Sequence, residues 1–126
     1  MHLIIGGRGQ GKLEYAMGLS DSEVVIANLG ACEFDEIFKA DIIFNLHLGI
    51  KKMIESDINP LEKFEQSMGM LMDKIIIGDE IGSGIVPQDS FERRWRDETG
   101  IVYSLLAKNA DRVERLWAGC VQKLKG

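Results

Sequence analysis

The first twelve residues constrain the fold more than any other stretch of the chain. A short apolar run of four residues leads directly into the glycine-rich sequence Gly6-Gly7-Arg8-Gly9-Gln10-Gly11-Lys12. This order predicts a buried strand, a tight loop and a helix that begins at the lysine, with the spacing of a phosphate-binding loop. Glycines allow backbone N–H groups to surround an anion, and the helix start and Lys12 add positive charge. The alternative is a glycine-rich turn that holds no ligand.

The residue after the lysine departs from the usual motif. That position normally carries Ser or Thr, whose hydroxyl binds Mg²⁺, and here it is Leu13. A leucine cannot ligate a metal. The loop therefore predicts a phosphate site with one metal ligand missing.

Length and charge exclude several classes of protein. The chain has 126 residues, which suits one domain over residues 1–126, and a net charge of -5, which argues against a nucleic-acid-binding surface. No stretch reaches membrane-spanning length. Cys32 and Cys120 lack metal-ligand spacing and form no disulfide framework, so a reducing, cytoplasmic location is expected.

Further strands and helices are expected to alternate along the chain. Compact apolar runs predict buried strands at 24–27, 41–45, 74–78 and 113–118. Helical spacing is expected at 13–19, 33–39, near 51–54, at 61–68 and in a long helix from Ser90, its plausible N-cap. Lys123 and Lys125 are expected in a basic tail, Trp95 and Trp117 to pack, and Met68, Met70 and Met72 to fill the core.

This alternation predicts an α/β fold with a mostly parallel sheet covered by helices on both faces. Ligands of such sheets bind at the carboxyl ends of the strands. The glycine loop, Asn45 and Asp79-Glu80 are all expected at that edge. Their shared location supports a nucleotide site more strongly than the loop does by itself.

A later segment resembles a known family. Glu80 through Pro87, then Arg96-Asp97, Gly100, Leu106-Ala107 and Ala110-Asp111-x-Val113 match, in order and spacing, motifs of the bifunctional adenosylcobinamide kinase / adenosylcobinamide-phosphate guanylyltransferase of cobalamin synthesis. Gly6-Gly7 and Gly11-Lys12 match the family's opening motif. The resemblance implies a P-loop NTPase-like three-layer sandwich, ATP or GTP and Mg²⁺ as cofactors, a corrinoid as substrate and a homo-oligomer.

The chain also departs from the family's pattern. Leu13 replaces Ser, Asn45 replaces an aspartate suited to Mg²⁺, and Tyr103-Ser104 replace Asn-Gln. The chain is shorter than family members, between the second and third strands, where they carry the histidine that takes up GMP. His2 and His47 lie in other contexts, so the guanylyltransferase half is expected to be absent.

The expected site residues follow from both arguments. Lys12, Glu80 and Asp79 are the candidate catalytic residues, and the two acids are also the candidate Mg²⁺ ligands. Arg96 could bind a second phosphate or form an ion pair with Glu92 one helical turn away. Arg93 and Arg94 are expected to be solvated surface residues or members of ion pairs. His47 is expected to pack or cap a helix. The nucleotide-binding residues are expected to be Gly6, Gly7, Arg8, Gly9, Gln10, Gly11, Lys12, Leu13 and Arg96.

Two functions remain open on the sequence. The first is a kinase that transfers the γ-phosphate of ATP or GTP to adenosylcobinamide. The second is an inactive relative that binds a nucleotide or corrinoid in a regulatory or assembly role. Leu13, Asn45 and the missing histidine segment favour the second. A structural remnant with an empty loop is a third possibility.

Overall fold

The computed structural model describes residues 1–81 and 89–126. Strands and helices alternate along most of the chain, as the apolar runs predict. The elements are β1 (His2–Gly6), α1 (Lys12–Met17), β2 (Ile26–Asn28), the 3-10 helix η1 (Phe34–Lys39), β3 (Ile42–Phe44), α2 (Leu46–Glu55), α3 (Pro60–Leu71), β4 (Ile75–Asp79), α4 (Ser90–Asn109), β5 (Arg112–Trp117) and β6 (Cys120–Lys125).

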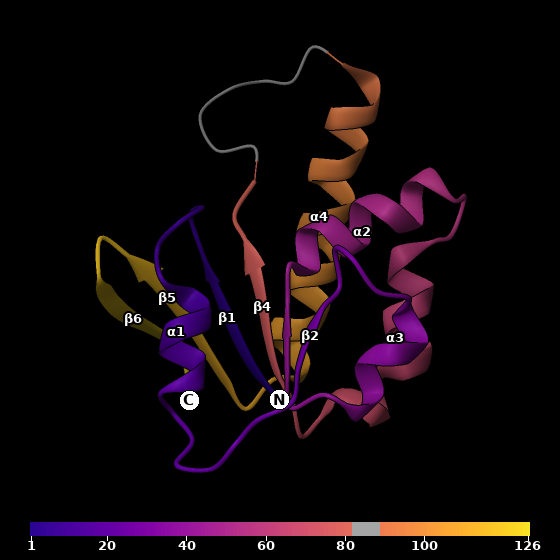
Figure 1. Ribbon diagram of the computed structural model, residues 1–126. Helices are drawn as coiled ribbons and strands as arrows, with labels where there is room; N and C mark the ends of the chain where they lie inside the picture. Colours follow the sequence, from indigo (N-terminus) through magenta and orange to yellow (C-terminus); the bar gives the residue numbers. More distant parts are fainter. Residues whose placement is uncertain (82–88) are drawn as a thin grey trace.

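The described strands form one sheet in the order β2-β3-β4-β1-β5-β6 (Figure 1). All neighbouring pairs are parallel except β5 and β6. The parallel strands bring their carboxyl ends to one edge, and β1 lies between β4 and β5. In this register Gly6 is the partner of Asp79, so the glycine loop begins beside the end of β4.

Two apolar clusters cover the two faces of the sheet. Alternate residues of each strand point to opposite faces. Leu3, Ile43 and Ile76 therefore join the larger cluster, with buried residues of η1, α2, α3 and α4. Their neighbours Ile4 and Ile42 face α1 and pack with its Ala16. The α/β layering with helices on both faces is confirmed, with most of the helical cover on one face (Figure 1).

Local signals explain where two helices begin. Asn59 caps α3, accepting a bond from the Glu62 amide, and Pro60 occupies the first turn, where a missing N–H costs nothing. The predicted cap of α4 was one residue off. Asp89, not Ser90, is the N-cap, and its carboxylate accepts from the Phe91 amide at 2.7 Å.

The C-terminal region differs from the prediction. Residues 120–125 form β6, an antiparallel edge strand, rather than a basic tail, because Ala118-Gly119 adopt positive φ and reverse the chain. Trp117 does not pack: it is 65 % exposed, beside this turn. All six residues of β6 are exposed, and Val121 and Leu124 do not recur at a period of two, so apolar periodicity did not indicate this strand.

Two other packing predictions were wrong. The strand expected at 24–27 is β2, and its Ile26 and the preceding Val25 are exposed, because β2 is the outermost strand. Met70 and Met72 are also exposed, since they lie on the outer side of α3 and just after it. Met68 does pack against the larger cluster.

Candidate functional site

The glycine loop joins β1 to α1 at the carboxyl edge of the sheet. Gly9 and Gly11 have φ values of 74° and 77°, a left-handed conformation that favours glycine. Helix α1 then begins at Lys12, as the sequence predicts, but it has only six residues. A short helix adds little dipole, so the positive charge that this loop offers an anion comes mainly from the side chains of Lys12 and Arg8.

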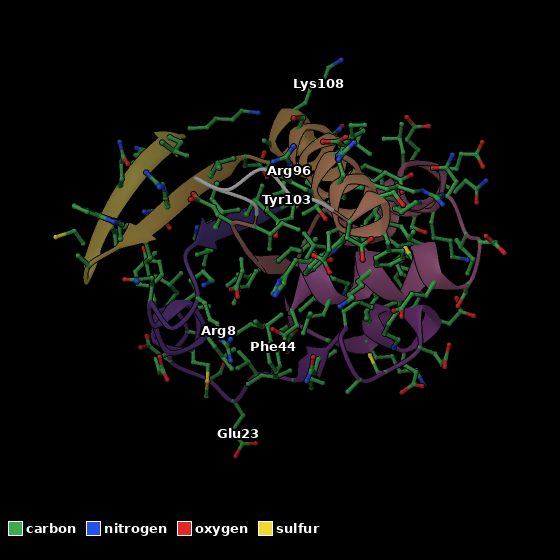
Figure 2. All side chains as sticks on the ribbon, turned by 90° about the horizontal axis from the view of Figure 1, so that it is seen from above. Arg8, Glu23, Phe44, Arg96, Tyr103 and Lys108 are labelled. Carbon is green, nitrogen blue, oxygen red and sulfur yellow. The ribbon has the colours of Figure 1, made fainter. Side chains whose placement is uncertain are left out.

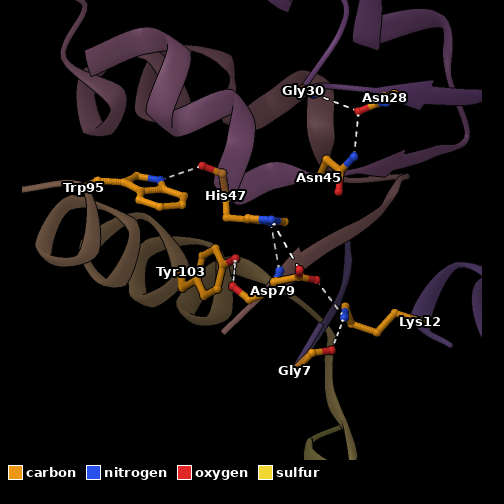
Figure 3. Close-up of polar contacts among 9 residues, drawn as sticks. All are labelled: Gly7, Lys12, Asn28, Gly30, Asn45, His47, Asp79, Trp95 and Tyr103. Carbon is orange, nitrogen blue, oxygen red and sulfur yellow. Dashed lines mark hydrogen bonds and ion pairs between the residues drawn. The ribbon is translucent and has the colours of Figure 1, made fainter. Parts of the chain in front are cut away.

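Lys12 is buried, and its ammonium faces the end of β4. Its Nζ donates to the Gly7 carbonyl oxygen at 2.7 Å and lies 2.8 Å from Asp79 Oδ1 (Figure 3). These two partners hold the positive charge at the inner side of the loop. A phosphate that enters the loop would have to compete with the Asp79 carboxylate for this ammonium.

Asp79 ends β4 and is held through its backbone as well as its side chain. Its amide donates to His47 Nδ1 at 3.1 Å, and its carbonyl accepts from the Tyr103 hydroxyl at 2.6 Å. Gly78 makes the second contact possible, because a Cβ there would lie 2.2 Å from the Tyr103 oxygen. Burial raises the pKa of Tyr103, with the charges of Asp79 and Glu80 adding to the effect, so the hydroxyl stays a donor.

His47 is a member of the site that sequence reasoning missed. It lies in the first turn of α2, buried, with Nε2 3.4 Å from Asp79 Oδ2. Burial lowers its pKa, and the charge of Lys12 adds to this while Asp79 opposes it. Its position shortly after β3, at the binding edge of the sheet, was the available signal. That signal was outweighed by the absence of an orienting neighbour in the sequence.

Glu80 follows Asp79 but turns toward β5. The Arg115 guanidinium contacts both of its carboxylate oxygens, at 2.7 and 3.0 Å. This bidentate contact raises the pKa of Arg115. Arg115 was not anticipated, because nothing in the sequence indicates that residues 80 and 115 meet.

A cavity of about 680 Å³ opens between the loop and the ends of β3 and β4. Its lining includes Arg8, Gly9, Gln10, Gly11, Lys12, Leu13, Glu14, Phe44, Asn45, His47, Leu48, Ile77, Asp79, Glu80, Ile81 and Trp95. Most of the residues expected to bind nucleotide therefore share one cavity with both candidate acids. The lining is mixed, because it contains the apolar side chains of Phe44, Leu48 and Trp95 as well as charged ones.

Arg96 is not in this lining. It lies on α4, with its Nε 3.8 Å from Asp97, and Figure 2 shows it near Tyr103 and apart from Arg8 and Phe44. Its neighbour Arg94 pairs with Glu98 at 3.0 Å, one helical turn further on. Within the described residues, the structure does not bring Arg96 to the loop.

Asn45 points toward β2. Its φ is 59°, and its side-chain amide donates to Asn28 Oδ1 at 2.9 Å, an oxygen that also accepts from the Gly30 amide. Asn45 thus ties the end of β3 to the end of β2. Gln10, in the loop, makes a similar tie to the β5–β6 turn by accepting from the Ala118 amide at 2.8 Å.

Few side chains among the described residues are available to ligate a metal ion. Leu13 packs against the cluster of Ile4 and Ala16, so it contributes packing rather than an oxygen ligand. Asp79 and Glu80 each contact a cation of the protein. Among residues 1–81 and 89–126 no group of three or more His, Cys, Asp or Glu side chains is arranged to hold a metal ion.

Part of the sequence resemblance falls on residues whose structure is not described. The described ranges leave out Gly82, Gly84, Ile85, Val86 and Pro87.

Within residues 1–81 and 89–126, none of the helices is both long enough and apolar enough to cross a bilayer.

Comparison with known proteins identifies the family. A search of curated proteins found no match. Residues 42–124 match the family model described as cobinamide kinase / cobinamide phosphate guanyltransferase, and this segment contains β3, β4, α4, β5 and the acids of the cavity. The match covers about two thirds of the chain, so the chain belongs to the cobinamide kinase / cobinamide phosphate guanyltransferase family, a nucleotide-binding family of cobalamin biosynthesis.

Proposed function

We propose that the protein binds ATP or GTP through residues 6–13 and transfers the γ-phosphate to a hydroxyl of adenosylcobinamide. The observation that carries this proposal is the contact of Lys12 with Asp79 at the inner end of the 680 Å³ cavity. This contact connects the glycine loop, which lies before residues 42–124, to Asp79, which lies within the segment that matches the family model. A phosphate-binding cation and a proton acceptor thus share one space.

The loop and Lys12 would hold the phosphates. A triphosphate carries more negative charge than one carboxylate, so it is the stronger partner for the Lys12 ammonium. Lys12 would leave Asp79 Oδ1 and the Gly7 carbonyl oxygen and contact the outer phosphates. The left-handed Gly9 and Gly11 allow backbone N–H groups to approach the same oxygens.

Asp79 would then face the acceptor. Phosphoryl transfer needs mainly positioning and neutralisation of charge, with a carboxylate to orient the attacking hydroxyl. Once Lys12 has moved to the phosphates, the Asp79 carboxylate is free for this task. Glu80 has a supporting role, because Arg115 holds it beside Asp79 and away from Lys12.

Mg²⁺ would enter with the nucleotide. The ion, when bound, neutralises charge on the transferring phosphate. Asp79 and Glu80 are the carboxylates that could contact it. Leu13 and Asn45 are poorer metal ligands than the Ser and Asp that the family pattern has at these positions. We therefore assign the ion to the phosphates first and to the protein second.

A second candidate is nucleotide binding without turnover. The packing of Leu13 against Ile4 and Ala16 favours it, because this position supplies no metal ligand.

We assign the kinase half alone, since His2 is paired with buried Glu114 and His47 faces Asp79 rather than an Arg-rich segment. We also propose one nucleotide-binding domain over residues 1–126 that assembles as a homo-oligomer, which light scattering would test.

Calorimetric titration with GTP and ATP, with and without Mg²⁺, tests the proposal. Micromolar binding by the wild type, lost in Lys12→Ala, is expected. Lys108→Ala is the matched control, because Lys108 is exposed near the end of α4, away from the cavity, and should bind like the wild type (Figure 2). Binding that survives Lys12→Ala would refute the loop assignment.

Transfer of phosphate to cobinamide separates the two candidates. The wild type should convert labelled triphosphate and cobinamide into cobinamide phosphate, and Lys12→Ala should not. Tight, Mg²⁺-indifferent binding without any product would instead establish the binding-only function.

A further inference from the structure

Both ring nitrogens of His47 face Asp79. Nδ1 lies 3.1 Å from the Asp79 backbone nitrogen, and Nε2 lies 3.4 Å from Oδ2 of the same residue. A backbone N–H can only donate, so Nδ1 must accept and carry no hydrogen. The hydrogen of the neutral ring is therefore on Nε2, the nitrogen that faces the carboxylate.

The orientation of the ring is held from the other side by α4. The Trp95 indole donates from Nε1 to the His47 carbonyl oxygen at 2.8 Å. The two rings lie 6.4 Å apart between centroids at an interplanar angle of 25° (Figure 3). With its backbone and one ring face held in this way, His47 can act as a rigid support for Asp79.

The two carboxylate oxygens of Asp79 have different partners. Oδ1 contacts the Lys12 ammonium at 2.8 Å, and Oδ2 faces His47 Nε2. The Asp79 backbone is held as well, at the amide by His47 and at the carbonyl by Tyr103. If a phosphate takes Lys12, His47 Nε2–H is, among the described residues, the side-chain contact that is left to orient the carboxylate.

We propose that His47 is a positioning residue for Asp79. In the free protein it keeps the carboxylate turned toward Lys12, and with triphosphate bound it keeps the same carboxylate turned toward the acceptor hydroxyl. This inference rests on the proposed function for its catalytic part only. The hydrogen-bond arrangement in the free protein does not depend on it.

His47 supports Asp79 while the phosphate is transferred. The acceptor oxygen forms a bond to the γ-phosphorus while the bond from that phosphorus to the β,γ-bridging oxygen breaks and releases the nucleoside diphosphate. The hydroxyl proton passes to the Asp79 carboxylate and from there to solvent. His47 keeps its Nε2 hydrogen throughout.

Two substitutions at His47 separate positioning from packing. In His47→Gln the side-chain nitrogen can take the place of Nε2 and donate to Asp79. In His47→Asn the side-chain oxygen can take the place of Nδ1 and accept from the Asp79 amide, but the donor to the carboxylate is lost. Both remove the imidazole, so a merely structural histidine would be affected similarly by both changes.

The kinetic expectation differs between the variants. His47→Asn should lower kcat for phosphate transfer by about tenfold or more, with the KM for nucleotide within about twofold of wild type. His47→Gln should retain activity to within about threefold of wild type. Equal losses in both variants, accompanied by equal falls in Tm, would overturn the inference.

Two measurements in the free protein need no nucleotide. With ¹⁵N-labelled protein, nuclear magnetic resonance should show a scalar coupling between the Asp79 amide nitrogen and His47 Nδ1, and a hydrogen on Nε2. Acylation of Lys12, followed by mass spectrometry with Lys108 as reference, should be faster in His47→Asn than in wild type or His47→Gln. A hydrogen on Nδ1, or an unchanged Lys12 rate in His47→Asn, would overturn the inference.

These measurements also distinguish the two possible failures. If the wild type bound no nucleotide, the proposed function would fall, and the coupling and the Lys12 acylation rate would still decide the role of His47. If nucleotide bound but the hydrogen were on Nδ1, the inference would fall and the proposed function would stand.

Discussion

The Lys12 ammonium and the Asp79 carboxylate lie 2.8 Å apart, although 67 positions separate them in the sequence (79 − 12). The parallel pairing of β1 with β4 brings them together, because it sets Gly6 beside Asp79. The ammonium that should bind phosphate is thus already occupied by an acid of the protein. Binding of nucleotide therefore includes the exchange of one anionic partner of Lys12 for another.

Asp79→Asn should tighten nucleotide binding and abolish transfer. Removing the competing charge frees the Lys12 ammonium, and a partly buried ion pair of about 1 kcal/mol corresponds to roughly fivefold in Kd. Loss of the proton acceptor should lower kcat by about 10²-fold or more. Calorimetry without Mg²⁺ and a phosphate-transfer assay measure the two effects. Asp73→Asn is the control, because Asp73 is exposed and precedes β4. Weaker nucleotide binding by Asp79→Asn would contradict the idea that Asp79 competes with phosphate for Lys12.

Leu13→Ser should introduce Mg²⁺ dependence into nucleotide binding. The serine hydroxyl restores the metal ligand that the loop lacks, and we expect a gain of about 1 kcal/mol, or roughly fivefold in Kd, only with Mg²⁺ present. Leu13→Ala is the matched control, since both changes remove the same packing against Ile4 and Ala16. Calorimetry with and without Mg²⁺ measures the effect. An equal response of both variants to Mg²⁺ would show that this position does not reach the ion.

Gly49→Ala should destabilise the fold, whereas Gly69→Ala should not. A Cβ on Gly49 in α2 would lie 2.3 Å from Cγ of Leu29, which is 2 % exposed, so this buried leucine would have to shift. The overlap should lower the free energy of unfolding by about 1–3 kcal/mol. Gly69 in α3 has no heavy atom within 4 Å of the same position, and alanine there should add about 0.5–1 kcal/mol. Urea unfolding of the two variants checks this contrast, and equal effects would contradict it.

Buried Glu114 should make stability depend on pH. Burial acts to raise its pKa, but hydrogen bonds from Tyr15 and His2 and the charges of His2 and Arg112 together lower it. Because the pKa is lower in the folded state, this stabilisation is present above the ordinary glutamate value of about 4.3 and is lost as pH falls through the folded value. Glu114→Gln should therefore be less stable than wild type above the ordinary glutamate value, and the difference should shrink below it.

Urea unfolding at several pH values between 7 and 3.5 measures this convergence. We expect Glu114→Gln to lower the free energy of unfolding at pH 7 by about 1–3 kcal/mol, and the gap to narrow below about pH 4. Burial also lowers the pKa of His2, so stability should already begin to fall below about pH 6.5 in the wild type. Glu65→Gln, on the exposed side of α3, is the control. A gap that stayed constant down to pH 3.5 would contradict the assignment.

The candidate site could be predicted in part. The loop, Lys12, Asp79 and Glu80 each end or follow an apolar run, and parallel strands bring such ends to one edge of a sheet. What the pattern could not supply was the choice of partner. Asp79 faces Lys12 while the adjacent Glu80 contacts Arg115, because neighbouring residues at a strand end point to different sides.

His47 and β6 illustrate why the remaining features were missed. A lone histidine carries no periodic signal, and its role arises only when α2 packs beside β4 and places both ring nitrogens at Asp79. The charged residues of β6 resembled a tail, and the strand exists because the turn at Ala118-Gly119 returns the chain along β5. Both depend on contacts between elements rather than on the residues of one element.

The sequence by itself determined the alternation of strands and helices, the glycine loop and the edge at which its polar residues gather, because apolar periodicity and glycine spacing are local properties of the chain. Only the tertiary structure decided that Lys12, Asp79 and His47 form one connected site, that Arg96 lies apart from it and that Glu80 is held by Arg115. The strand order and the packing of α2 and α4 against the sheet determine which of these side chains meet. Both result from how the apolar faces of all the elements are buried together.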